Sequence, residues 1–193
     1  MDNIFLDLKR LKYLGIGAII GKTVRIRKPE DTCIGDHTII DDFAYISCSI
    51  EVGNNCHIAS HVSISGGMGH FRMGDFSTVS NHCSIHCASS DYTSLSLDLP
   101  SVAPEERFGG IVEGVAIGRY VTVGAHSCIL PGAHLPDGAA FGAYSLIDRS
   151  DYKSLGLYVG IPAKFHRFRD VAQNAPEFLR ALRNTSIRSN DDD

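Results

Sequence analysis

The chain has 193 residues, of which 44% are hydrophobic and 21% charged, so it is long enough for one globular domain with at most a small appendage. Its 18 Lys and Arg residues against 22 Asp and Glu residues give a formal net charge of −4, which disfavours DNA or RNA as a partner. No apolar run approaches the roughly 20 residues that cross a bilayer, and charges interrupt the apolar start, unlike in a signal peptide. We therefore expect a cytoplasmic protein without a membrane span, whose 6 cysteines are reduced thiols.

The first segment, residues 1–15, is expected to form a short amphipathic helix. Its large apolar residues recur near helical spacing over residues 2–14, at Ile4, Phe5, Leu8, Leu11 and Leu14. The segment would precede a domain, residues 16–169, with a different period.

That domain repeats every six residues. A large apolar residue, often followed by Gly, recurs in three registers: Ile34, Ile40, Ile46, Val52, Ile58 and Ile64; Met73, Val79 and Ile85; Ile117, Val123, Ile129, Leu135, Phe141 and Ile147. The residue four places later is usually small or Val. Helices repeat at 3.6 residues and half-buried strands at two, so a sustained period of six predicts short strands, each forming one flat side and one turn.

Three such sides make one coil of a parallel β-helix, and the fifteen hexads therefore predict five coils. Ile20 and Ile26 fit a weaker leading turn, separated from the main run by two extra residues. The alternative is a β-sandwich or an α/β domain with accidental spacing. The β-helix is favoured because the Gly after the apolar residue and the small corner residue recur together.

Two insertions interrupt the repeat, and a different kind of segment follows it. Residues 65–72 add three residues between hexads, and residues 91–116 form a long loop. Both leave from the third side of a coil, so we expect them at the same corner of the prism. Residues 170–193 are expected to hold a C-terminal helix over 170–183, which starts properly near Pro176, and a loose tail.

The repeat, together with IGRYVTVGAHSCILPGAHLPDGAAFGAYSLI at 117–147 and VGIPAKFHRFR at 159–169, resembles the hexapeptide-repeat acyltransferases. It is most similar in style to the O-antigen and exopolysaccharide sugar acetyltransferases, and it also resembles maltose and galactoside acetyltransferases. This resemblance covers about residues 15–169. It implies an all-β, left-handed parallel β-helix, a homotrimer, acetyl-CoA as acyl donor in a cleft between neighbouring β-helices, and a sugar hydroxyl or amine as acceptor.

The donor site can be placed from the same resemblance. A pantetheine arm lying along the β-helix needs small outward residues on the second side, where its amides can meet the backbone like an added strand. The matching positions form a strip: Ala59, Ser60, Ser80, Asn81, Gly124, Ala125, Gly142 and Ala143. Alternatively, the repeat simply prefers small residues there.

Beyond the last coil, the resemblance places the phosphorylated nucleotide of CoA. Lys164, Arg167 and Arg169 follow that coil, and their cationic groups suit phosphates. The alternative is a solvated basic face.

The base is harder to assign. In the maltose and galactoside relatives a catalytic His ends the third side before the long loop, but this place holds Ser90 here. The stretch CASSDY at 87–92 resembles instead the polysaccharide branch, which leaves Asp91 to orient a His or to hold a sugar hydroxyl.

Among the 9 histidines, His82 is the first candidate base because it directly follows the strip where the thioester sulfur should lie. His57, one coil lower, is the second candidate, and an imidazole with an ordinary pKa of about 6.5 suits either role. His86 and His70 are expected to be surface residues. Residues 82–87 carry zinc-ligand types, but the inward position of Cys83 argues against a metal site.

These features predict an acetyl-CoA-dependent O-acetyltransferase that acts on a sugar in surface-polysaccharide biosynthesis. A neutral amine can attack a thioester before it loses its proton, so the missing His at Ser90 keeps N-acetylation of an amino-sugar nucleotide open as an alternative. Acetylation of a xenobiotic and a non-catalytic trimeric scaffold are further alternatives.

Overall fold

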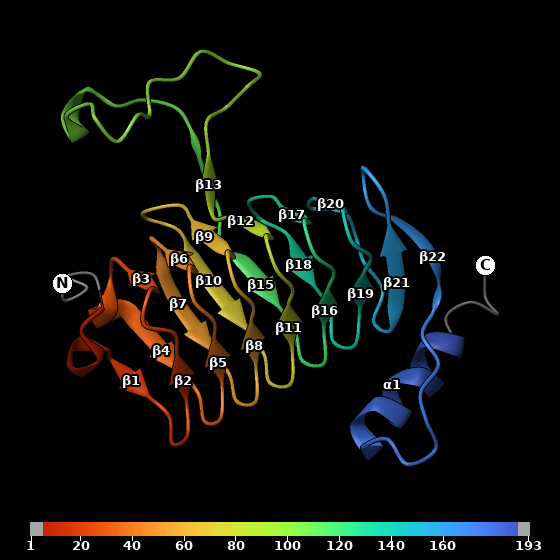
Figure 1. The fold of residues 1–193 in the computed structure, drawn as a ribbon. Helices are drawn as coiled ribbons and strands as arrows, with labels where there is room; N and C mark the ends of the chain where they lie inside the picture. The colour runs from red at the N-terminus through yellow and green to blue at the C-terminus, as the bar shows by residue number, and fades with distance from the viewer. Residues whose placement is uncertain (1–5, 189–193) are drawn as a thin grey trace.

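The chain winds into a three-sided prism whose faces are parallel β-sheets (Figure 1). The structure, a computed structural model, describes residues 6–188. Each coil adds one strand to each face in turn, so most strands pair in parallel with the strand one coil away. The parallel β-helix predicted from the hexads is therefore confirmed.

The first face contains β1 (Tyr13–Leu14), β4 (Thr32–Ile34), β7 (Ser49–Val52), β10 (His70–Met73), β15 (Val115–Ile117) and β18 (His134–Leu135). The second face contains β2 (Ile19–Ile20), β5 (Ile39–Ile40), β8 (His57–Ile58), β11 (Thr78–Val79), β16 (Thr122–Val123), β19 (Ala140–Phe141), β21 (Gly156–Val159) and β22 (Lys164–Phe168). The third face contains β3 (Arg25–Ile26), β6 (Tyr45–Ile46), β9 (Ser63–Ser65), β12 (Ser84–His86), β17 (Cys128–Ile129) and β20 (Leu146–Ile147).

These strands make six complete coils, numbered 1 to 6 from the N-terminus, rather than the five predicted. The additional coil is the weak leading turn: Leu14 pairs with Ile34, and Ile20 pairs with Ile40. A short 3₁₀ turn, Pro29–Asp31, takes up the two extra residues between this coil and the next.

The core is a column of apolar side chains inside the prism. Every one of the fifteen predicted inward residues is buried, with exposed fractions between 0% and 4%. Some buried hydroxyls near the corners donate to backbone carbonyls of the next coil, as Thr38 does to Gly53 at 2.7 Å and Ser77 to Gly118 at 2.8 Å. Each of the five buried hydroxyl side chains within residues 6–188 donates to a backbone carbonyl, as buried polar groups generally do.

The corners have a shared backbone conformation. The first corner joins the first face to the second, and the second corner joins the second face to the third. At most of these corners, the third residue after an inward residue has a positive φ. At ten positions this residue is not Gly, with φ between 54° and 66°: His37, Phe43, Asn55, His61, Phe76, His82, Tyr120, His126, Tyr144 and Leu155. The rings among them stack from coil to coil, which favours an otherwise uncommon conformation.

The predicted N-terminal helix is wrong for the part of it that the structure describes. Residues 6–14 form a 3₁₀ turn, Leu8–Arg10, followed by β1, while residues 1–5 lie outside the described residues. Leu6 and Leu11 pack against the prism core. The apolar spacing therefore reflects packing onto the end of the prism and entry into the first coil.

The C-terminal helix begins at the predicted place and ends later. Helix α1 spans Glu177–Arg188, directly after Pro176, whereas residues 170–176 are not helical. Residues 184–188, predicted to be loose, continue the helix, and 189–193 lie outside the described residues. No helix within residues 6–188 is long and apolar enough to cross a membrane.

Both insertions leave from the third face, as predicted. The long one begins with β13 (Ala88–Ser89) and ends with β14 (Ile111–Val112), which pair antiparallel, and it includes a 3₁₀ turn, Pro104–Glu106. In Figure 1 this arm stands away from the prism and bends toward its N-terminal end. The short insertion lies beside its base, since a Cβ on Gly69 would come within 2.4 Å of the Cys87 carbonyl oxygen.

Candidate functional site

The small-residue strip lies where the second face turns into the third face. Its members follow β8, β11, β16 and β19, so the strip runs parallel to the prism axis along the second corner of coils 3 to 6. Asn81 donates from its side-chain amide to the Ser60 hydroxyl at 2.8 Å, which links the polar end of the strip across two coils. The strip is therefore a band of small side chains along one edge of the prism.

The added-strand interaction expected for this strip is not available at its first positions. The N–H groups of Ala59, Ser80, Gly124 and Gly142 donate to carbonyls of the following coil at 2.8–3.0 Å. Coils of a β-helix pair along the axis, so these groups are already used in holding the prism together. The strip can still offer room to an extended chain. Close packing between the coils also requires a small residue here, because a Cβ on Gly124 would come within 2.4 Å of the Ala143 nitrogen.

His82 belongs to a ladder of rings beside the strip. The ring ladder consists of Phe43, His61, His82, His126 and Tyr144, one per coil from coil 2 to coil 6. Neighbouring ring centroids are 4.7–4.9 Å apart. The exposed His82 ring therefore has His61 on one face and His126 on the other, so only its edge can meet a ligand.

His57 has the partner that a general base needs. It points outward from β8, and its Nε2 lies 2.8 Å from Oδ2 of Asp41, with both side chains roughly half exposed. The carboxylate favours the Nε2–H tautomer, which leaves Nδ1 as a proton acceptor. Sequence reasoning missed Asp41, although its position directly after Ile40 makes it a diagonal neighbour of His57 on the second face.

This pair lies at the end of the strip. Asp41 and Asp42 occupy in coil 2 the two positions that the strip occupies in coils 3 to 6. Hydrogen bonds from the Thr23 N–H and hydroxyl, at 2.9 and 2.7 Å, lower the pKa of Asp42. The strip thus runs from small residues at the C-terminal coils to a His–carboxylate pair at coils 2 and 3.

The three predicted phosphate-binding cations are spread across the second face. Val159 pairs with Lys164 and Gly156 pairs with Phe168, so β22 runs antiparallel from the second corner back to the first. Lys164 therefore lies at the end of the strip, whereas Arg169 reaches the opposite corner. The Arg167 guanidinium lies 3.3 Å from the Asp170 carboxylate.

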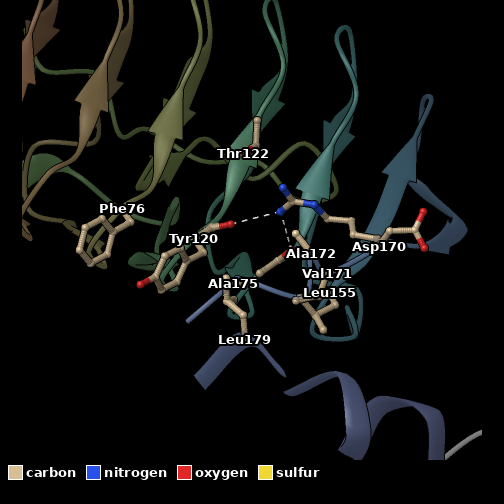
Figure 2. A pocket seen from close by; sticks show the side chains of 11 residues that line it. Phe76, Tyr120, Thr122, Leu155, Asp170, Val171, Ala172, Ala175 and Leu179 are labelled. Carbon is tan, nitrogen blue, oxygen red and sulfur yellow. Dashed lines mark hydrogen bonds between the residues drawn. The ribbon is translucent and has the colours of Figure 1, made fainter. Parts of the chain in front are cut away.

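The Arg169 side chain is partly buried and is bonded to the backbone of the prism. One of its guanidinium nitrogens donates to the carbonyls of Tyr120 and Gly138 at 3.2 and 2.7 Å, and burial lowers the pKa of this side chain. It lines a cavity of about 240 Å³ between the first corner and the C-terminal segment. In Figure 2 the rings of Phe76 and Tyr120 lie on one side of this cavity, and Leu179 of α1 lies below.

Asp91 is bonded within its own loop. Its carboxylate accepts hydrogen bonds from the Ser94 hydroxyl and from the Thr93 hydroxyl and N–H, which lower its pKa to about 2. Ser90, at the place of the catalytic His in the maltose relatives, donates to Asp98 at 3.0 Å. Within residues 6–188, neither side chain has a hydrogen bond to a histidine, and the Asp91 carboxylate stabilises the turn at the start of the long loop.

The cysteine and histidine cluster at 82–87 divides between core and surface. Cys83 is 1% exposed, as predicted, and its thiol donates to the Gly124 carbonyl at 3.1 Å. His86 lies on the third face beside Ser65 and Cys128; the Cys128 thiol raises the pKa of His86, and His86 lowers the pKa of Cys128. Within residues 6–188, no three His, Cys, Asp or Glu side chains gather closely enough to hold a metal ion.

Comparison with known proteins agrees with this architecture. Residues 31–66 match the family model described as bacterial transferase hexapeptide (six repeats). The chain is 33% identical over 170 residues to a dTDP-4-amino-4,6-dideoxy-D-glucose acyltransferase of Escherichia coli, which covers 83% of this chain and 86% of the relative. The chain belongs to the hexapeptide-repeat acyltransferases. The family resemblance predicted from the sequence is confirmed, and the protein is an acyltransferase.

Two solved structures show how the fold is shared. AntD, an N-acyltransferase from Bacillus cereus crystallised with dTDP and 3-hydroxybutyryl-CoA, is 25% identical, with a TM-score of 0.78 and coverage of 98% of this chain and 99% of AntD. A maltose O-acetyltransferase from Clostridium difficile 630 is 18% identical, with a TM-score of 0.54 and coverage of 85% and 73%, and it shares the fold alone. The N-acyltransferase thus matches more of the chain than the O-acetyltransferase does.

Proposed function

We propose that this protein transfers an acyl group from acyl-CoA to the amine of a nucleotide-linked amino sugar of the dTDP-4-amino-4,6-dideoxyglucose class. The observation that carries the proposal is the match along nearly the whole chain to acyltransferases of that substrate class. It favours the N-acylation alternative over the O-acetylation predicted first. Ser90 at the place of the O-acetyltransferase histidine supports the same choice, because a neutral amine needs less help from a base.

The donor site is the small-residue strip. Lys164 lies at its C-terminal end, where it can meet a phosphate of CoA, and the pantetheine arm extends from there along the second corner toward coil 3. Adjacent coils are about 4.8 Å apart, so coils 6 and 3 are separated by about 14 Å, which an extended arm can span. The thioester then lies beside Ala59 and Ser60, next to His57.

The His57–Asp41 pair supplies the base. The amine nitrogen forms a bond to the thioester carbonyl carbon, the bond between that carbon and sulfur breaks, and CoA leaves as the thiolate. Nδ1 of His57 takes the proton that the amine nitrogen loses, and the thiolate takes up a proton in turn, so the products are an amide and free CoA. Asp41 holds the ring through Nε2 and stabilises the imidazolium that forms. His82 contributes to the wall of the channel.

We further propose a homotrimer in which the arm packs on a neighbouring copy. Tyr92 and Leu95 on the arm are 92% and 87% exposed, and the arm stands away from its own prism (Figure 1). Large apolar side chains on a projecting arm are typical of a contact with another chain. Such a contact would close the donor cleft, which one prism leaves open on one side.

The test compares an amine with a hydroxyl at the same position of the acceptor. Purified protein is incubated with acetyl-CoA or a longer acyl-CoA and either dTDP-4-amino-4,6-dideoxyglucose or dTDP-6-deoxyglucose. Free thiol release and the mass of the product are measured. We expect an amide product with the amino sugar only. Transfer to the hydroxyl compound at a comparable rate would instead support the O-acyltransferase, and thiol release without either acceptor would show hydrolysis alone.

A further inference from the structure

The first coil carries a concentration of positive charge that the donor site does not use. Residues 22–28 contain four cations, and residues 16–29 contain no carboxylate, on a chain whose net charge is −4. Arg25 precedes the inward Ile26 in β3 and Arg27 follows it, so both side chains point outward from the third face, and both are exposed. Two guanidinium groups on one strand present a surface suited to a phosphate-bearing ligand.

The neighbouring side chains extend this surface toward the other coils. Tyr45 is the register partner of Arg25, and its hydroxyl lies 3.5 Å from a guanidinium nitrogen of Arg27. Ser63 pairs with Tyr45, and Ser84 pairs with Ser63, so the same outward column continues with hydroxyl groups. The third face therefore changes from cationic to aromatic to hydroxyl-bearing between coil 1 and coil 4.

Two carboxylates close to this coil have partners within the prism. Asp42 accepts hydrogen bonds from the N–H and hydroxyl of Thr23, and Glu30 forms an ion pair with Arg10. Lys28 donates to the Gly67 carbonyl at 2.6 Å, which fixes the short insertion at the edge of the same surface. The arm also bends toward this end of the prism (Figure 1).

The distance to the donor site fits a nucleotide-linked sugar. The thioester lies at the second corner of coil 3 in the proposed function, and β3 lies two coils away, about 10 Å along the axis. This is comparable with the span from the C4 amine of a hexose across the ring to the diphosphate on C1. An acceptor that points its amine toward His57 would therefore reach the two arginines with its phosphates.

We infer that Arg25 and Arg27 bind the diphosphate of the acceptor nucleotide, and that the sugar lies along Tyr45 and Ser63 toward the second corner. The inference rests on the proposed function and adds the binding site of the acceptor. It assigns the two substrates to different parts of the prism, with the donor along the second corner and the acceptor on the third face. The amine and the thioester then meet at the edge between those faces.

The test uses dTDP as probe, with thymidine as the matched compound without phosphate. Binding of dTDP and of acetyl-CoA is measured by calorimetry for the wild type, Arg25→Gln, Arg27→Gln and the double variant. Arg149→Gln is the control, because Arg149 is an exposed arginine that follows the third face of coil 6 and its loss changes the net charge equally. Thermal melting verifies that each variant is folded, which the exposure of these side chains leads us to expect.

Each single substitution is expected to weaken dTDP binding about tenfold and the double substitution about 100-fold. Thymidine and acetyl-CoA should bind as to the wild type, KM for the amino-sugar nucleotide should rise with little change in kcat, and Arg149→Gln should have no effect. Unchanged dTDP affinity in the double variant, or an equal loss of acetyl-CoA affinity, overturns the inference while acyl transfer by the wild type still supports the proposed function. A wild type that neither binds dTDP nor acylates the amino sugar overturns both.

Discussion

Two adjacent residues, Phe141 and Gly142, should respond oppositely to substitution. Phe141 is 2% exposed and packs against Tyr152 and Tyr158, with ring centroids 5.0 and 5.2 Å away. Phe141→Ala removes these contacts and leaves a cavity, so we expect it to lower the free energy of unfolding by about 3–5 kcal/mol. Gly142 faces outward in the strip, and its φ is not positive.

The cost of a side chain at Gly142 can be judged from its surroundings. A Cβ there would meet the Val159 Cγ1 atom at 2.9 Å and the Tyr158 carbonyl oxygen at 3.7 Å, so only the end of one half-exposed side chain must move. We expect Gly142→Val to cost about 1 kcal/mol or less. Its branched side chain should nevertheless fill the channel and abolish measurable acetyl-CoA binding. Gly124 is unsuitable for this test because its Cβ would collide with backbone atoms.

Stability and binding are measured separately for the two variants. Urea unfolding gives the free energy of unfolding, and calorimetry at a temperature where both variants are folded gives the acetyl-CoA affinity. We expect Phe141→Ala to be destabilised but to bind, and Gly142→Val to be stable but not to bind. Equal destabilisation would refute the inward and outward assignments. Unchanged affinity in Gly142→Val would move the donor to another side of the prism.

Three further predictions follow from the site and its surroundings. Steady-state kinetics should show that His57→Ala lowers kcat about 100-fold and Asp41→Asn lowers it by less, with acetyl-CoA affinity unchanged. His82→Ala should retain kcat within a few-fold of the wild type. A larger loss of kcat in His82→Ala than in His57→Ala would assign the base to the ring ladder. Burial raises the pKa of Tyr152 to about 12, so its neutral form contributes stability that is present below pH 10 and is lost as the pH rises toward 12. Urea titrations at increasing pH should therefore show a smaller decrease in the free energy of unfolding for Tyr152→Phe than for the wild type. Equal decreases in the two proteins would refute this. Light scattering should give a trimer, and Tyr92→Ser with Leu95→Ser should weaken it; a monomeric wild type would contradict the shared cleft.

The prism could be predicted from the sequence because each of its flat sides and turns takes six residues, and few other folds have that period. An inward residue every six positions and a small residue at the corner determine burial directly, and all fifteen inward residues were identified. The first coil was underestimated because Leu14 and Ile20 are at the open end of the prism, where partial exposure relaxes the pattern. The N-terminal helix was predicted wrongly for a related reason, since the same apolar residues fit helical spacing and packing on the prism end.

The site was less predictable because its members come from different coils. Hexad position placed the strip on the second corner, and sequence order alone suggested that Lys164, Arg167 and Arg169 act together. The antiparallel course of β22 separates them across the second face, which no spacing in the sequence revealed. Asp41 was missed for the converse reason: it becomes a neighbour of His57 only when coil register is combined with the alternation of side chains across a strand.

The ring ladder shows why nine histidines could not be ranked from local context. His61, His82 and His126 occupy the same corner position in successive coils, each with a positive φ and a ring stacked on its neighbours. A residue type that recurs at one position in several coils has a structural role in the coil. Here that role is to form a corner with a positive φ, which His tolerates better than most residues. His57 occupies a position that Ile, Thr and Ala fill in the other coils, and it alone among those positions has an acidic partner at 2.8 Å among the described residues. Departure from the repeat, rather than the identity of the side chain, is therefore what distinguishes the candidate base from the histidines that build the corner.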